Sequence, residues 1–298
     1  MSTGYVFLAI AIVGYGLLGI FHKLADHPSC RPKLIAIILL FFGAVLSTLY
    51  TGTLDKVGLT FPTTLIWIGL LGGVFSSLAL ASFQTGLKFG KISTSWLVLN
   101  LSMSIPIMLS IVAYGEKLTI AKGVGLLMVL IAILALWWDK KKELTVTGVE
   151  HHPSAITVAS KWLPLMLLAF FANGLAASSQ KVLVERGFGE MSWQYLVVLY
   201  WAGFSFLMLL SLKDRALPHV REWVVGFAMA LASVTANVSL VFALDRHVPG
   251  SVAYPIGNGG SLFLVVLAGV LFFREHLSRF GVAGILLGIS AIVVLTMA

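Results

Sequence analysis

Ten stretches of mostly apolar residues follow one another along this chain. A helix of about 20 apolar residues is long enough to cross the hydrocarbon core of a bilayer. Only 11% of the 298 residues are charged, whereas an average soluble domain has about 25%. The pattern predicts an all-α membrane protein with ten transmembrane helices, in contact with the lipid bilayer. The predicted spans are 3–23, 33–53, 63–87, 92–114, 118–138, 161–182, 192–212, 222–244, 250–273 and 279–297.

The loops between these spans differ in positive charge. Of the 20 Lys and Arg residues, 14 fall in the first, third, fifth, seventh and ninth loops, and 6 fall in the other four. Cytoplasmic loops carry the excess of Lys and Arg in membrane proteins. We therefore expect the odd-numbered loops in the cytoplasm and both termini outside. The chain's net charge of +8 reflects these loops, and we expect no nucleic-acid partner.

The chain aligns with itself at an offset of 158–159 residues. Lys23 falls on Lys181, Glu116 on Glu275, and 113–136 matches 271–295. We expect a first five-helix repeat at 1–138, a solvated linker at 139–160 and a second five-helix repeat at 161–298. Five spans per half make the second half inverted relative to the first. Inverted repeats are typical of secondary transporters, whose substrate site lies near the midplane between the halves.

A short element follows the fourth and ninth spans, at Gly115–Thr119 (GEKLT) and Arg274–Ser278 (REHLS). With the ten spans and the five-plus-five repeat, this element resembles the EamA-like transporters of the drug/metabolite transporter superfamily. The resemblance implies export of amino acids or other metabolites, and relatives in the superfamily move sugars, nucleotide sugars or phosphorylated sugars. It also implies cytoplasmic termini, which is the opposite of the charge bias, and both orientations stay open.

Polar and aromatic side chains recur inside the spans at steps of three, four and seven residues, which place them on one side of a helix. No span has a charge near its centre, where a charge is costly. We predict that these side chains line a substrate site. The alternative is hydrogen bonding between helices for the polar residues and plain packing for the rings. The candidates are Tyr15, His22, Gln84, Trp96, Asn100, Asn173, Gln180, Asn237, Tyr254 and Asn258.

A second group of residues is a candidate for gating or ion coupling. Lys23, Glu116, Lys181 and Glu275 sit at span ends, and the repeat predicts one acid–base pair in each half. Alternatively, they are interfacial charges that reach the headgroups. Pro106 and Pro255 lie inside the fourth and ninth spans. Proline kinks a helix, so each position is either a hinge or a plain kink.

The sequence therefore predicts a secondary transporter of a small neutral or zwitterionic metabolite. An amino acid is the first expectation, moved by export or exchange, and a sugar, nucleoside or nucleotide sugar is the alternative. A non-transporting membrane scaffold is the rival of another class. We expect no enzyme activity, because the spans hold no Ser–His pairing or carboxylate dyad, and we expect no cofactor or metal. The protein is expected in a bacterial inner membrane, as a monomer or homodimer.

Overall fold

The computed structural model describes residues 2–53, 61–115, 117–146, 153–212, 217–246, 248 and 250–297. In that part of the chain every regular element is helical, so the predicted all-α class is confirmed. Apolar runs in lipid must satisfy their backbone hydrogen bonds internally, and a helix does so. The helices are α1 (Ser2–Leu24), α2 (Pro32–Thr53), α3 (Thr63–Leu87), α4 (Ile92–Leu101), α5 (Ser104–Tyr114), α6 (Ile120–Val146), α7 (Pro153–Glu185), the 3₁₀ turn η2 (Gly189–Met191), α8 (Ser192–Leu210), α9 (Val220–Asp245), α10 (Gly250–Leu271) and α11 (Arg279–Met297).

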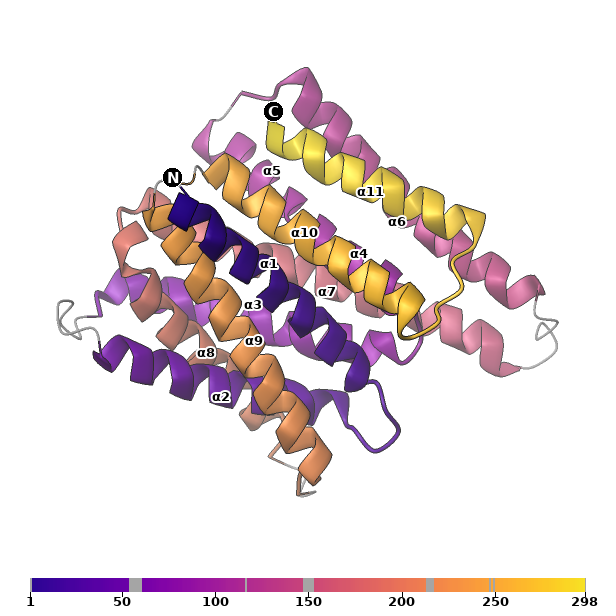
Figure 1. Cartoon of the computed structure of the whole chain (residues 1–298), viewed down its shortest axis with the longest axis horizontal. Coiled ribbons are helices and arrows are strands. Elements are labelled where there is room, and N and C mark those ends of the chain that lie inside the picture. The colour runs from indigo at the N-terminus through magenta and orange to yellow at the C-terminus, as the bar shows by residue number, and fades with distance from the viewer. Residues whose placement is uncertain are drawn as a thin grey trace.

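The helices form one bundle in which elements from the two ends of the chain are interleaved. Helix α1 packs against α9 and α10, and α3 packs against α7 and α8. Helices α6 and α11 pair along one edge, and the N- and C-termini lie at the same end of the bundle (Figure 1). Each half of the sequence is thus packed mainly through the other half.

Eight helical stretches in the described residues are long and apolar enough to cross a membrane. They lie in α1, α2, α3, the α4–α5 pair, α6, α7, η2–α8 and α9, while Gly259–Leu271 of α10 and Arg279–Leu295 of α11 are shorter apolar stretches. Large apolar side chains such as Val112 and Ile120 are exposed on the outside of the bundle. The chain is therefore a multi-pass integral membrane protein.

The fourth span is two helices rather than one. Helix α4 ends at Leu101, five residues before Pro106, and α5 begins at Ser104, two residues before it. A proline ring clashes with the carbonyl four residues earlier, which is that of Ser102. That carbonyl instead accepts a hydrogen bond from Ile105 N–H at 3.0 Å. Helix α10, by contrast, continues past Pro255, which lies within two turns of its start.

The segment 139–160, predicted as a solvated linker, is partly helical in the structure. Helix α6 continues to Val146 and α7 begins at Pro153, so both extend into 139–160. Lys, Glu and Leu have high helix propensity, and such residues make up much of 139–146. The polar composition of this segment indicated solvent exposure, but it is also compatible with helix.

Candidate functional site

The carboxylate of Glu275, in the loop after α10, lies at the N-terminus of α4. It accepts hydrogen bonds from Ile92 N–H at 2.7 Å and from Ser93 N–H and Oγ at 3.2 and 2.7 Å. Lys91, at the cap position of α4, makes no side-chain cap bond. The first N–H groups of a helix lack partners within it and carry partial positive charge. A residue of the second half thus caps a helix of the first half.

Lys23, at the end of α1, completes this group. Its Nζ lies 3.9 Å from Glu275 Oε1 and 3.1 Å from Asp26 Oδ2. Lys23 therefore lies beside a glutamate of the other half, which the N-terminus of α4 holds in place. The predicted pair within the first half stays a prediction, since Glu116 lies outside the described residues. We call Lys23, Ile92, Ser93 and Glu275 the latch. The end of the bundle with residues 25–31, 88–91, 211–212, 217–219 and 272–278 is the latch end.

Glu222 makes a second charged contact between the halves at the latch end. It is fully buried in the first turn of α9, where a negative charge is favourable. Arg31 Nη2 lies 2.8 Å from Glu222 Oε2, and Arg31 Nε donates to Oε1 at 3.1 Å. These hydrogen bonds to Glu222 raise the pKa of Arg31 above its ordinary value.

Further hydrogen bonds join the halves at the latch end. The donors are two lysines, an arginine and a tryptophan. The pairs are Lys33 with the Leu210 carbonyl, Lys91 with the His276 carbonyl, Arg221 with the Leu24 carbonyl, and Trp162 Nε1 with Ser95 Oγ.

Fewer contacts of this kind join the halves at the opposite end, within the described residues. Toward that end, Trp201 Nε1 donates to Thr48 Oγ1 at 3.0 Å, and Arg246 Nη1 lies 3.4 Å from Thr3 Oγ1. Lys181 lies 2.9 Å from Glu185 of its own helix, and Glu116, which the repeat aligns with Glu275, lies outside the described residues. Among the described residues, the polar contacts between the halves are thus more numerous at the latch end.

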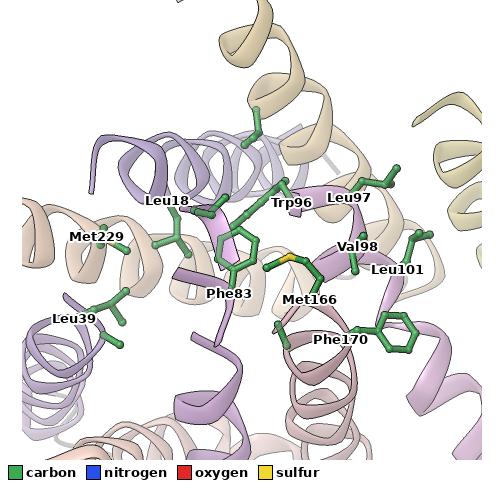
Figure 2. Packing of buried hydrophobic residues seen from close by; sticks show 14 of the residues in the cluster. Leu18, Leu39, Phe83, Trp96, Leu97, Val98, Leu101, Met166, Phe170 and Met229 are labelled. Carbon is green, nitrogen blue, oxygen red and sulfur yellow. The ribbon is translucent and has the colours of Figure 1, made fainter. Parts of the chain in front are cut away.

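Directly inside the latch, three of the predicted site residues come together. His22 Nδ1 lies 2.5 Å from Gln84 Oε1, and Gln84 Nε2 donates to the His22 carbonyl at 3.1 Å. The His22 ring centroid is 5.9 Å from that of Trp96 and 5.1 Å from that of Phe83. We call His22, Phe83, Gln84 and Trp96 the buried cluster. Figure 2 shows Phe83 and Trp96 side by side within the core.

Two polar atoms of the buried cluster have no hydrogen-bond partner among the described residues. They are His22 Nε2 and Trp96 Nε1, in side chains that are 2% and 4% exposed. Buried polar groups in native proteins are nearly always paired, and each exception needs an explanation. Two such atoms in neighbouring rings identify this cluster as the strongest candidate binding site in the described structure.

The other predicted site residues divide between contacts across the bundle and local ones. Tyr15 donates to Asn237 Oδ1 at 3.0 Å, joining α1 to α9. Asn173 of α7 donates to the Leu99 carbonyl at 3.3 Å and to Ser102 Oγ at 2.7 Å, directly at the break between α4 and α5.

Asn100 donates to the Trp96 carbonyl of its own helix at 2.8 Å. Gln180, about two turns after Asn173 in α7, is exposed and does not join the buried cluster. The side chains of Tyr254, Pro255 and Asn258 lie outside the described residues.

The sequence analysis missed several polar groups in α8. Gln194 is 1% exposed and its Nε2 lacks a partner. Tyr195 bonds Ser179 at 2.5 Å, and Tyr200 bonds Ser233 at 2.7 Å. Gln194 could have been found as an amide in an apolar span. Phe83 has no such signal, since nothing in the sequence distinguishes it from the other core phenylalanines.

Comparisons with known proteins support a relation to transport proteins without showing a family. No family model matches the chain. The multidrug resistance protein EbrA of Bacillus licheniformis is 28% identical over 102 residues, which are 32% of this chain and 97% of EbrA. One protein of known crystal structure has the same fold: it aligns with a TM-score of 0.62 over 99% of this chain and 98% of its own, at 18% identity.

Proposed function

We propose that this protein is a secondary transporter in which two inverted halves expose a site to the two sides of the membrane in turn. The observation that carries the proposal is the asymmetry of the bundle. Charged and hydrogen-bonded contacts between the halves gather at the latch end, and unpaired polar atoms lie buried just inside it. A site closed from one side by contacts that can break is what alternating access requires.

The similarity to EbrA supports this proposal at the level of the drug/metabolite transporters. The inverted repeat stays part of the proposal. It is supported by the backbone at Gly115 and Arg274, which the repeat aligns at an offset of 159. Both have a left-handed φ, +68° and +52°. In this proposal the latch is the gate of one half, and Lys181 and Glu116 belong to the symmetry-related gate of the other half.

The substrate that fits the buried cluster best is a small neutral or zwitterionic metabolite. The cluster offers an imidazole, an indole and a carboxamide, without a charged side chain of its own. An amino acid is our first expectation and a sugar or nucleoside the second. A nucleotide sugar would need a cationic partner for its phosphates. Export or exchange, a bacterial inner membrane, and a monomer or homodimer complete the proposal.

The latch can be tested with the native chain, because Cys30 is its only cysteine. Cys30 is fully buried in the loop at the latch end. Glu275→Gln removes the charge that holds Lys23 and caps α4, worth about 1 kcal/mol. We expect maleimide to modify Cys30 about five-fold faster in this variant, and transport in proteoliposomes to change with it.

The matched control for this test is Glu185→Gln, which breaks the exposed pair with Lys181. Such a pair contributes little, so labelling of Cys30 should not change. Equal labelling rates in both variants, with folding intact, would contradict a gate at the latch.

The scaffold alternative predicts a different outcome for the polar residues. Under the transport proposal, Asn100→Ala or Asn258→Ala loses flux while expression and thermal stability are kept. Under the scaffold alternative the same variants lose stability and there is no flux to lose. A thermal-shift screen of the purified protein against metabolites would supply the substrate for the flux assay, since a ligand that binds the folded state raises the melting temperature.

A further inference from the structure

The orientation of Gln84 determines which hydrogen-bonding atom His22 presents to Trp96. The main-chain carbonyl of His22 needs a donor, and Gln84 Nε2 supplies it at 3.1 Å. Gln84 Oε1 must then face His22 Nδ1, 2.5 Å away. Because a carboxamide oxygen only accepts, the proton of the neutral imidazole lies on Nδ1. His22 Nε2 is left with a lone pair and is an acceptor.

The two unpaired atoms of the buried cluster are therefore complementary rather than alike. His22 Nε2 accepts a hydrogen bond, and Trp96 Nε1–H can only donate one. A carboxylate would satisfy Trp96 but would turn its lone pairs toward that of His22. An ammonium would satisfy His22 and leave Trp96 unpaired. A hydroxyl donates and accepts through one oxygen atom, which suits two rings whose centroids are 5.9 Å apart.

We propose that His22 and Trp96 form the binding site for a hydroxyl group of the transported solute. The inference rests on the proposed transport function and narrows its substrate to hydroxyl-bearing solutes, such as hydroxy-amino acids, sugars or nucleosides. Phe83, 5.7 Å from Trp96 between ring centroids, provides an apolar wall for the carbon next to that hydroxyl. The nearby charges of Lys23 and Glu275 lie against each other in the latch.

The position of the pair connects binding to the gate. His22 directly precedes Lys23, and Trp96 is one turn along α4 from Ser93, which bonds Glu275. Both rings are buried in the present conformation. A solute from the latch side reaches them only when Glu275 leaves the N-terminus of α4. The hydroxyl then accepts from Trp96 Nε1–H and donates to His22 Nε2.

The experiment uses solutes that differ by one hydroxyl. Threonine and valine have nearly the same shape, and ribose is compared with 2-deoxyribose. Binding to the purified full-length protein and uptake into proteoliposomes are measured for each solute. A buried group left unpaired costs enough that we expect the hydroxyl member of a recognised pair to bind about ten- to one-hundred-fold more tightly.

Trp96→Phe keeps an aromatic ring and removes the donor. We expect this variant to lose most of the preference for the hydroxyl member while its melting temperature stays near that of the native protein. Trp67→Phe, at a side chain 63% exposed on the outside of the bundle, is the matched control and should keep the preference.

Three results would overturn the inference. If both members of a pair bind and move equally, transport stands and the hydroxyl site fails. The same holds if Trp96→Phe keeps the preference. If none of the four solutes binds or moves, the hydroxyl site and the proposed transport of such metabolites fail together.

Discussion

Arg274 occupies a backbone conformation that is unfavourable for a residue with a side chain. Its φ of +52° is left-handed, which costs a non-glycine residue about 1–2 kcal/mol. The aligned Gly115 ends α5 in the same region, at φ +68°, without that cost. The left-handed turn at 274 directly precedes Glu275, so the turn directs Glu275 toward α4.

We predict that Arg274→Gly stabilises the protein. The relief of the left-handed conformation is partly offset by the entropy that glycine loses on folding, about 0.5–1 kcal/mol. A net gain of about 0.5–1 kcal/mol is expected, measured as a higher melting temperature in detergent. Gly115→Ala is the reciprocal variant and should lower it. A loss of stability in Arg274→Gly would mean that interactions of the arginine side chain contribute more to stability than the left-handed backbone costs.

Asn173 illustrates how one amide supports a broken helix. It bonds the Leu99 carbonyl and Ser102 Oγ, at the point where α4 and α5 separate. We predict that Asn173→Ala costs about 1–3 kcal/mol, because the two hydrogen bonds that join α7 to the break are lost. The measurement is thermal unfolding, with Gln180→Ala, an exposed position on the same helix, as the control. Equal melting temperatures for the two variants would contradict this role.

Many residues of the candidate site could be predicted from the sequence, but which of them contact one another could not. The step from Tyr15 to His22 and the amides in apolar spans were visible as polar groups in a hydrophobic background. The contact of Lys23 with Glu275 joins residues 252 positions apart, and it depends on where α4 begins. Nothing local to either residue contains that information, and the symmetry of the repeat pointed to partners within each half.

At the scale of elements, helix α10 approaches α4 closely because Gly269 has no side chain. A Cβ at this position would collide with Ser93 Oγ and would lie 3.0 Å from Glu275 Oε2. The latch therefore needs glycine for space. The helices themselves were predictable from apolar run length, whereas the break in the fourth span depends on Pro106 and on Asn173 from another helix.

We predict that Gly269→Ala loosens the latch without destroying the bundle. The variant should increase maleimide labelling of Cys30. It should also lower the free energy of unfolding by about 1–3 kcal/mol, as overpacking does, which is measured as a lower melting temperature. Gly123→Ala is the control, since a Cβ there has nothing within 4 Å, and it should be neutral or stabilising. Unchanged labelling of Cys30 in Gly269→Ala would contradict the prediction that the latch needs glycine at this position.

At the scale of the whole molecule, the bundle has two unlike ends. The termini share one end (Figure 1), and the contacts of Lys23, Arg31 and their partners lie at the other. The even number of predicted spans already required the termini to share a side. The asymmetry in contacts between the halves was not predictable, because a sequence repeat describes both conformations of a transporter equally.

We predict from the Lys and Arg bias that the latch end faces the cytoplasm and that both termini lie outside. Epitope tags at the two termini should be cut by protease added to intact spheroplasts, whereas a tag within 147–152 should be protected. The reverse pattern would give the orientation that the family resemblance implies, and would make the latch an outer gate.

The capping of α4 by Glu275 also bears on how the protein is made. During synthesis α4 enters the membrane long before residue 275 exists, so its first N–H groups begin without the partner that they have at the end. Glu275 follows nine of the ten predicted spans. The cap of α4 therefore stays incomplete until most of the second half has been synthesised, and a chain truncated before residue 275 should be recognised by membrane quality control as unfinished.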